Sequence, residues 1–93
     1  MFKSTQNKGF QITFENDITI SVQFGKENYC SNRNSENSIF TTDCKDAEIA
    51  IWQGDNWFDF GADTVKGYVS PSEVAEWIAK IQKVQNINHL INN

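Results

Sequence analysis

Apolar and polar residues alternate along residues 9–24, and this alternation predicts a β-hairpin. The segment reads GFQITFENDITISVQF, in which every second residue is apolar on either side of a polar break. A period of two is typical of strands with one buried face. Directly opposed residues share a face, so Phe14 must oppose Ile18, and residues 15–17 form a three-residue loop. The Asn and Asp in this loop tolerate the left-handed backbone conformation that such loops require.

A second hairpin is predicted by residues 47–63, AEIAIWQGDNWFDFGAD, with a tight turn at Gly-Asp-Asn. The favoured register gathers four large apolar side chains on one face by placing Ile49 opposite Phe60 and Ile51 opposite Phe58. The same register places Trp52 opposite Trp57 on the other face. A one-residue bulge at Gly54 would change it. In this register both tryptophans point away from the main core.

An amphipathic helix is predicted to begin at Ser70. Ser70-Pro71-Ser72-Glu73 is a capping box with proline at the first helical position. Large residues then recur at helical spacing and form one buried stripe: Val74, Trp77, Ile78, Ile81 and Val84. Trp77 is therefore expected in the core. The tail NINHLINN is expected to continue the helix raggedly and to fray, because asparagine is a weak helix former.

These elements predict an α+β fold, in which two hairpins form an antiparallel four-stranded sheet and the one C-terminal helix packs on one face. The 93 residues, 1–93, form a single domain with a modest core. The segment 25–45 is rich in asparagine and serine and is the one long connection; such connections are functional or mobile. Within it, residues 39–42 have strand-like composition, and they form either a short extra strand or a plug at the sheet edge.

Charge and hydropathy argue against several classes of partner. The formal net charge is −4 and no basic run compensates for it, so the protein should repel nucleic acid. Its carboxylates are too sparse for a DNA mimic. The first residues lack the apolar core of a secretory signal, and no apolar run approaches the length of a membrane span. We therefore expect a cytoplasmic protein with no direct nucleic-acid or membrane partner.

No residue pattern predicts catalysis. His89 is the only histidine and lies in the tail, with no serine or cysteine positioned by the sequence for activation. Asp55, Asp59 and Asp63 recur every four residues, a spacing that does not bring them together on strands and turns. The expectation is a protein that is not an enzyme, with no catalytic residues and no cofactor.

The two cysteines, Cys30 and Cys44, bracket a polar loop. They could meet as a disulfide, but a reducing cytosol favours free thiols, and two cysteines alone make a poor zinc site. No metal site is predicted.

Aromatic residues give the strongest functional signal. Trp52 and Trp57 are expected at the centre of a partner-binding surface, with Tyr29 and Asp59 at its rim, because such residues supply large contact area at little entropic cost. In the alternative, the segment 25–45 folds over the open face and the tryptophans form a second small core beneath Ile39 and Phe40. A homodimer is also predicted, because the strand 18–24 carries no proline and no inward charge that would discourage pairing at a sheet edge.

Several segments resemble short proteins encoded by bacteriophages and prophages. The similarity spans residues 3–84 and includes KGFQITFEN, ENYC, AEIAIW, WFDFG and VKGYVSPSEVAEWIAKI. Small acidic phage proteins are often inhibitors that bind a host defence component, as anti-CRISPR proteins do, or sponges that sequester a nucleotide signal. The resemblance thus implies a phage-derived inhibitor of a host defence protein, acting in the host cytoplasm. The alternatives are a nucleotide sponge with its pocket at an oligomer interface, or a structural or host-takeover protein.

Overall fold

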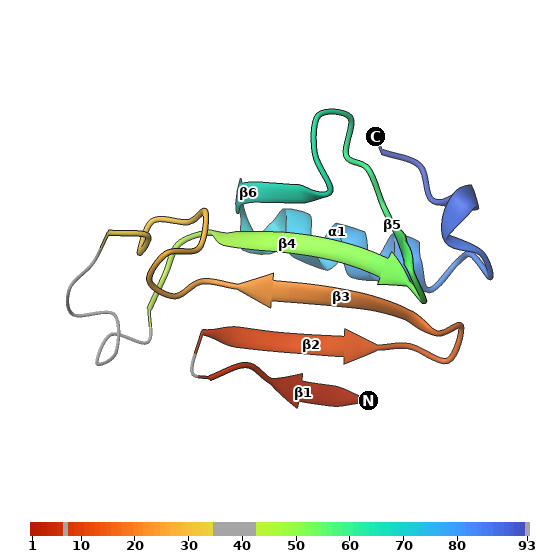
Figure 1. Ribbon diagram of the computed structural model, residues 1–93, viewed down its shortest axis with the longest axis horizontal. Helices are drawn as coiled ribbons and strands as arrows, with labels where there is room; N and C mark the ends of the chain where they lie inside the picture. Colours follow the sequence, from red (N-terminus) through yellow and green to blue (C-terminus); the bar gives the residue numbers. More distant parts are fainter. Residues whose placement is uncertain (7, 35–42, 93) are drawn as a thin grey trace.

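The computed structural model describes residues 1–6, 8–34 and 43–92 and shows an antiparallel sheet with one helix packed on it (Figure 1). The elements in chain order are β1 (Phe2–Ser4), β2 (Gly9–Thr13), β3 (Ile18–Gln23), β4 (Ala47–Gln53), β5 (Asn56–Trp57), β6 (Val65–Val69), α1 (Pro71–Ile81) and the 3-10 helix η1 (Ile87–His89). The strand order is β1-β2-β3-β4, and both β5 and β6 pair with β4. The α+β class is confirmed, but the described residues form six strands rather than four.

The first hairpin has the predicted register. Ile12 lies opposite Ile20, and the backbone N–H of Phe14 donates to the carbonyl of Ile18 at 3.0 Å, so residues 15–17 form the loop. Asp17 adopts φ +67°, the left-handed conformation expected there. The parity of apolar residues therefore sets this turn.

Asn16, at the centre of that loop, caps the far end of α1. Its Nδ2 donates to the carbonyls of Ile81 at 2.8 Å and Val84 at 2.7 Å, and its Oδ1 accepts from the N–H of Ile18 at 3.0 Å. The last carbonyls of a helix have no partner within the helix, so this side chain satisfies groups that would otherwise need water. One asparagine thus joins the first hairpin to the helix.

Replacing Asn16 with alanine is expected to lower the free energy of unfolding by about 2–3 kcal/mol, since three part-buried hydrogen bonds are lost at roughly 0.5–1.5 kcal/mol each. Urea unfolding followed by circular dichroism measures the loss. The matched control is Asn56→Ala, which removes one exposed side-chain bond, to Asn88. An equal loss in the two variants would contradict the capping role.

The second hairpin matches the prediction at its tip and departs from it further along. Trp52 lies opposite Trp57, and Gly54 holds φ +62° at the first position of a two-residue turn, the place that glycine takes in type II′ turns. Phe58 still donates its N–H to the carbonyl of Ile51 at 2.8 Å.

The predicted pairing of Ile49 with Phe60 is wrong. Ile49 pairs instead with Lys66 of β6. The chain leaves β4 after Phe58 because Phe58 and Phe60 turn onto Trp77, with ring centroids 5.4 and 5.3 Å from the indole. Aromatic packing against the helix therefore replaces continued strand pairing.

The start of α1 is as predicted. The Ser70 side chain accepts from the N–H of Glu73 at 3.2 Å, and proline occupies the first turn. The carboxylate of Glu73 accepts from Lys66 Nζ at 2.6 Å and from Trp77 Nε1 at 3.1 Å. The hydrogen bond from Lys66 is the main cause that lowers the pKa of Glu73. This carboxylate therefore ties β6 to the helix, and Trp77 is in the core as predicted.

The prediction that the tail continues the helix and frays is wrong. α1 ends at Ile81, and the buried side chains of Ile87 and Leu90 join the core. The Gln53 side chain donates to the carbonyl of Gln85 at 3.0 Å and accepts from the N–H of Ile87 at 3.1 Å. Burial of two apolar side chains and these bonds from β4 outweigh the weak helix propensity of the asparagines.

The basis of the predicted dimer is also wrong. The strand at 18–24 is β3, which lies inside the sheet and is paired with β2 on one side and β4 on the other. The edge beyond β2 is formed by β1, whose pairing of Phe2 with Ile12 was not predicted because three residues are too few to show alternation. No helix in the described part of the chain combines the length and apolar character that a bilayer crossing demands.

Candidate functional site

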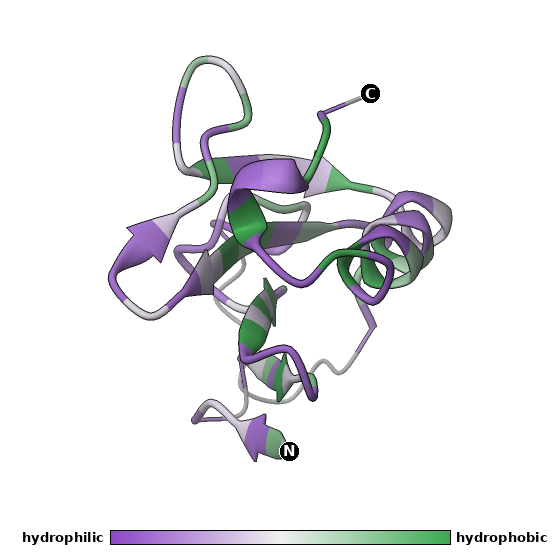
Figure 2. Ribbon diagram, turned by 90° about the vertical axis from the view of Figure 1, so that its right-hand side faces the viewer, coloured by the Kyte–Doolittle hydropathy of each residue, from purple (hydrophilic) through white to green (hydrophobic). Residues whose placement is uncertain are grey.

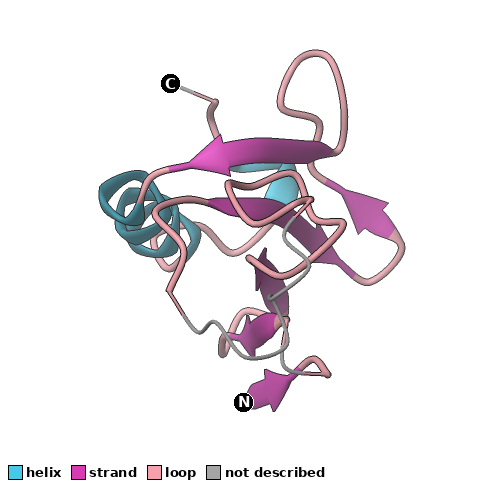
Figure 3. Cartoon of the chain, turned by 90° about the vertical axis from the view of Figure 1, so that its left-hand side faces the viewer, coloured by secondary structure: helices cyan, strands magenta, loops and turns pink. Residues whose placement is uncertain are grey.

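The sheet has one covered face and one face turned away from α1. Figures 2 and 3, viewed from opposite ends, both show α1 to one side of the sheet and the β4–β5 hairpin projecting to the other. We call the side of β3 and β4 that carries Thr19, Ser21, Ala50 and Trp52 the open face, because it is turned away from α1. Thr19, Ser21 and Ala50 are nevertheless buried, with at most 9% of each exposed. The residues between these positions point to the other face of the same strands, and they belong to the core; Ile20 and Ile51 are examples.

Trp52 and Trp57 form a stacked pair on the open face. Their ring centroids are 4.7 Å apart and the planes are inclined by 26°. Trp57 is 48% exposed, while Trp52 is half-buried. Thr19 lies directly opposite Trp52 and is buried; its hydroxyl is hydrogen-bonded to that of Thr13 at 2.8 Å. The two rings therefore stack on each other, and Trp52 lies across from a buried, hydrogen-bonded threonine.

Tyr29 lies on the same face, further along β4. Its backbone N–H donates to the Glu48 carboxylate at 2.8 Å, and its carbonyl accepts from the N–H of Tyr68 at 2.8 Å. A side chain on Gly67 would meet the Tyr29 Cβ at 2.6 Å, so glycine is needed there. Trp52 follows Glu48 by four positions, which corresponds to about 13 Å along a strand. The predicted rim residue is therefore on the open face but well away from the tryptophans.

The ring of Tyr29 is 47% exposed and is covered on one side by the guanidinium of Arg33, 4.2 Å from the ring centroid. This cation–π contact fixes the ring against the loop that carries it.

Asp59 lies on the other side of the pair, close to the C-terminal tail. It is exposed, and its Oδ1 accepts from the N–H of Gly61 at 2.7 Å. Asp59 and Trp57 line a shallow hollow of about 270 Å³ together with Ile87 and Leu90. Asp59 therefore lies near Trp57, as predicted. Ile39 and Phe40, the predicted cover of a second core, lie outside the described residues.

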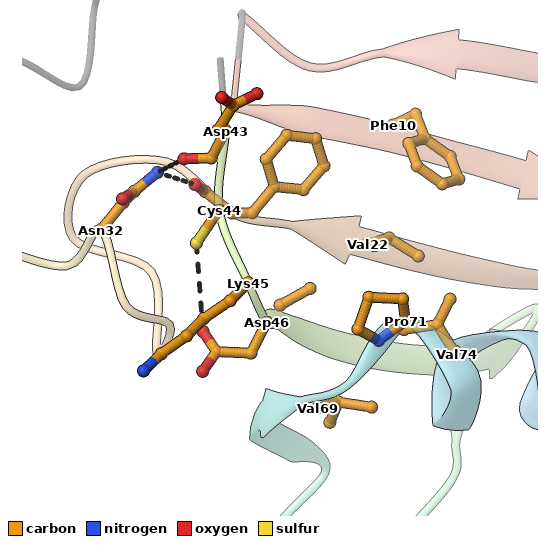
Figure 4. Close-up of a pocket in the computed structure, with 12 residues that line it drawn as sticks. Phe10, Val22, Asn32, Asp43, Cys44, Lys45, Asp46, Val69, Pro71 and Val74 are labelled. Carbon is orange, nitrogen blue, oxygen red and sulfur yellow. Dashed lines mark hydrogen bonds between the residues drawn. The ribbon is translucent and has the colours of Figure 1, made fainter. Parts of the chain in front are cut away.

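A larger cavity, of about 680 Å³, lies on the helix side of the sheet, at the end where β3 finishes and β4 begins. Figure 4 shows its apolar residues on one side and its polar residues on the other. The apolar side is lined by Phe10, Val22, Val69, Pro71 and Val74, and the polar side by Asn32, Asp43, Cys44, Lys45 and Asp46. This cavity was not predicted, because its lining comes from five separated segments of the chain.

Both cysteines approach Asp46 at the edge of this cavity. The Sγ atoms of Cys30 and Cys44 and a carboxylate oxygen of Asp46 all lie within 4.8 Å of one another. Cys44 Sγ is 3.9 Å from Asp46 Oδ1, and Cys30 is a buried thiol that donates to the carbonyl of Gly25 at 3.5 Å. Burial raises the pKa of Cys30 to about 11. Both cysteines are free thiols.

No family model matches this chain, and no curated protein or solved structure proved similar to it. The phage resemblance and the role that it implies therefore stay predictions.

Proposed function

We propose that this protein is a recognition protein rather than an enzyme, and that it binds a partner protein through the open face around Trp52 and Trp57. The observation that carries the proposal is the stacked, partly exposed tryptophan pair, with the exposed acidic residues Asp55 and Asp59 beside it. Protein interfaces commonly have an aromatic centre that supplies most of the affinity and a polar rim that excludes water.

The stacking of the two rings supports a binding role. Each ring is fixed by its neighbour and by the paired backbone of β4 and β5. A partner therefore does not have to order loose side chains, which commonly costs about 0.5–1.5 kcal/mol for each one immobilised. The surface is preorganised for contact.

The charges beside the pair favour a partner with a basic rim. Asp55 in the β4–β5 turn and Asp59 beyond Trp57 are both exposed, and the protein carries a net charge of −4. Complementary charge at a rim speeds association and excludes wrong partners more than it adds affinity. In line with the phage resemblance, the proposed partner is a bacterial defence protein, and the proposed role is its inhibition in the host cytoplasm.

A plating assay tests this role. Bacteria that carry a cloned defence system should regain sensitivity to phage when they express the protein, and should lose it again with the Trp52→Ala/Trp57→Ala variant. The control is Phe2→Ala, which removes an aromatic side chain that is 80% exposed on β1. Absence of rescue across a broad panel of defence systems would contradict the defence role. Rescue by the double variant would contradict the binding face.

The second candidate function is binding of a small molecule, and the 680 Å³ cavity favours it, since ligand sites usually measure about 300–1,000 Å³. A nucleotide signal is a poor fit to this cavity, because the two carboxylates in its lining, Asp43 and Asp46, outnumber the single cation, Lys45. A ligand with an apolar body and a neutral or cationic end fits better.

Thermal unfolding with a panel of cyclic and linear nucleotides separates the sponge from the protein-binding proposal. Ligand at about 100 times its dissociation constant adds about 2.7 kcal/mol of stability. A clear upward shift of the midpoint by one nucleotide would favour the sponge. No shift with any nucleotide would remove it.

A further inference from the structure

We propose that Cys30, Cys44 and Asp46 form a binding site for a thiophilic divalent cation of the Zn²⁺ class. Neither a metal site nor the participation of Asp46 was predicted from the sequence, because nothing in the spacing of these residues reveals that they converge. The site is independent of the proposed protein-binding face.

The positions of the three ligand atoms carry the proposal. Two thiol sulfurs and one carboxylate oxygen lie within 4.8 Å of one another. In a tetrahedral zinc site, metal–ligand distances of about 2.0–2.3 Å put the ligand atoms roughly 3.4–3.8 Å apart. The remaining gap can close by rotation of the Cys44 side chain, because Cys44 is only partly buried. Three protein ligands leave a fourth position for water, which is a common zinc arrangement.

The carboxylate is already oriented by a second layer of hydrogen bonds. Asp46 Oδ1 accepts from the backbone N–H of Ser31 at 2.6 Å, and the Ser31 hydroxyl donates to Oδ2 at 2.9 Å. Hydrogen bonds of this kind hold metal-binding carboxylates in place in known sites.

The backbone on both sides of the cluster is also joined. Asn32 Nδ2 donates to the carbonyls of Phe24 at 3.3 Å and Asp43 at 3.0 Å. This amide bridges the chain next to Cys30 and the chain next to Cys44. The framework of the site is thus assembled by the protein alone.

The local charge leaves room for a cation. No lysine or arginine in the described part of the chain forms an ion pair with Asp46; the ion pair described there is between Lys66 and Glu73. A divalent ion would neutralise the carboxylate and bind both sulfurs as thiolates.

A disulfide is the competing use of the same two sulfurs. Forming it would join the two Sγ atoms and release two protons and two electrons to an oxidant such as oxidised glutathione. The carboxylate of Asp46 has no part in that reaction, whereas it is a natural third ligand for a cation. Asp46 therefore distinguishes the two uses experimentally.

Titration of the reduced protein with Co²⁺, followed by displacement with Zn²⁺, tests the site. We expect an absorption band from thiolate-to-cobalt charge transfer that saturates at one ion per chain and disappears on addition of Zn²⁺. Cys44→Ser should abolish the band. Asp46→Asn should weaken binding at least about tenfold, which is the lower end of the loss seen when even an outer partner of a metal ligand is removed.

Asp43→Asn is the matched control, because Asp43 lines the same cavity but does not belong to the three-residue cluster. It should leave cobalt affinity unchanged. Circular dichroism of each variant shows that it is folded, and Cys44 is preferred to the buried Cys30 for replacement for that reason.

Three outcomes would overturn the proposal. The first is the absence of a charge-transfer band in protein whose two thiols are shown to be free by reaction with a thiol reagent. The second is an equal effect of Asp46→Asn and Asp43→Asn. The third is quantitative disulfide formation with oxidised glutathione in protein that binds no cobalt when reduced, which would assign the cysteines to redox chemistry instead.

Discussion

Replacing Trp77 with alanine is expected to lower the free energy of unfolding by about 3–5 kcal/mol, the range found when large buried aromatic residues are truncated. Trp77 is 3% exposed and is the central contact between α1 and the segment that follows β5. The rings of Phe58 and Phe60 meet its indole edge-on or nearly so. Alanine would leave a cavity among three elements, and the Glu73 carboxylate would lose the bond from the indole.

Urea unfolding of the variant and of wild type measures this loss, with an unchanged slope against denaturant as the sign that the unfolded states are comparable. Trp57→Ala is the matched control, since it removes the same side chain from an exposed position and costs only its stacking, about 0.5–1.5 kcal/mol. A loss of less than about 1 kcal/mol for Trp77→Ala would show that the helix does not depend on this contact.

The first hairpin and the start of the helix could be predicted because each is specified by neighbouring residues. Opposed apolar residues must share a face, which sets the pairing of Ile12 with Ile20. The capping residue Ser70 acts on an N–H three residues away. Such signals are complete within a short window of sequence.

β6 escaped prediction because its backbone is irregular. Residues 65–69, VKGYV, pair with β4 through a register shift between Ala47 and Ile49, and Tyr68 adopts φ +55°. An irregularity of this kind breaks the period of two by which a strand is recognised. The glycine at 67 is explained only by the side chain of Tyr29 packed against it, a residue 38 positions earlier in the sequence.

The end of the chain was mispredicted because contacts with distant residues, not its own sequence, decide its structure. Its position is set by side chains of distant residues, Asn16 in the first loop and Gln53 at the end of β4. Helix propensity describes the tail alone, whereas the buried Ile87 and Leu90 gain from contact with the whole core. Tertiary contacts of this kind leave no local pattern.

The two candidate sites also differ in whether neighbouring residues or the path of a loop bring their side chains together. The tryptophan pair could be predicted because parity along β4 and β5 places both rings on one face. The cluster of Cys30, Cys44 and Asp46 depends on the path of the loop between β3 and β4, so spacing alone could not reveal it. Tyr29 was expected at the rim of the tryptophan surface, but it lies in the loop between β3 and β4, where parity does not apply, and its distance from the tryptophans was not predicted.

The double replacement Trp52→Ala/Trp57→Ala is expected to weaken the proposed protein complex by more than about 2 kcal/mol, or about 30-fold in dissociation constant. The reason is that the two stacked rings form the aromatic centre of the proposed interface, while Thr19, Ser21 and Ala50 on the same face are buried and Tyr29 lies well away along the sheet. The fold itself should lose about 1–3 kcal/mol, because the stacking is lost and Trp52 is half-buried over β3.

Once the partner is in hand, calorimetry gives the change in affinity, and urea unfolding gives the change in stability. The single variants add a stricter test. If the rings act as one preformed surface, removing either should cost nearly as much affinity as removing both, since each ring holds the other in place. Strictly additive losses would mean that the rings contact the partner independently. A loss of stability above about 4 kcal/mol in the double variant would instead assign the pair to a second core and place the binding surface elsewhere.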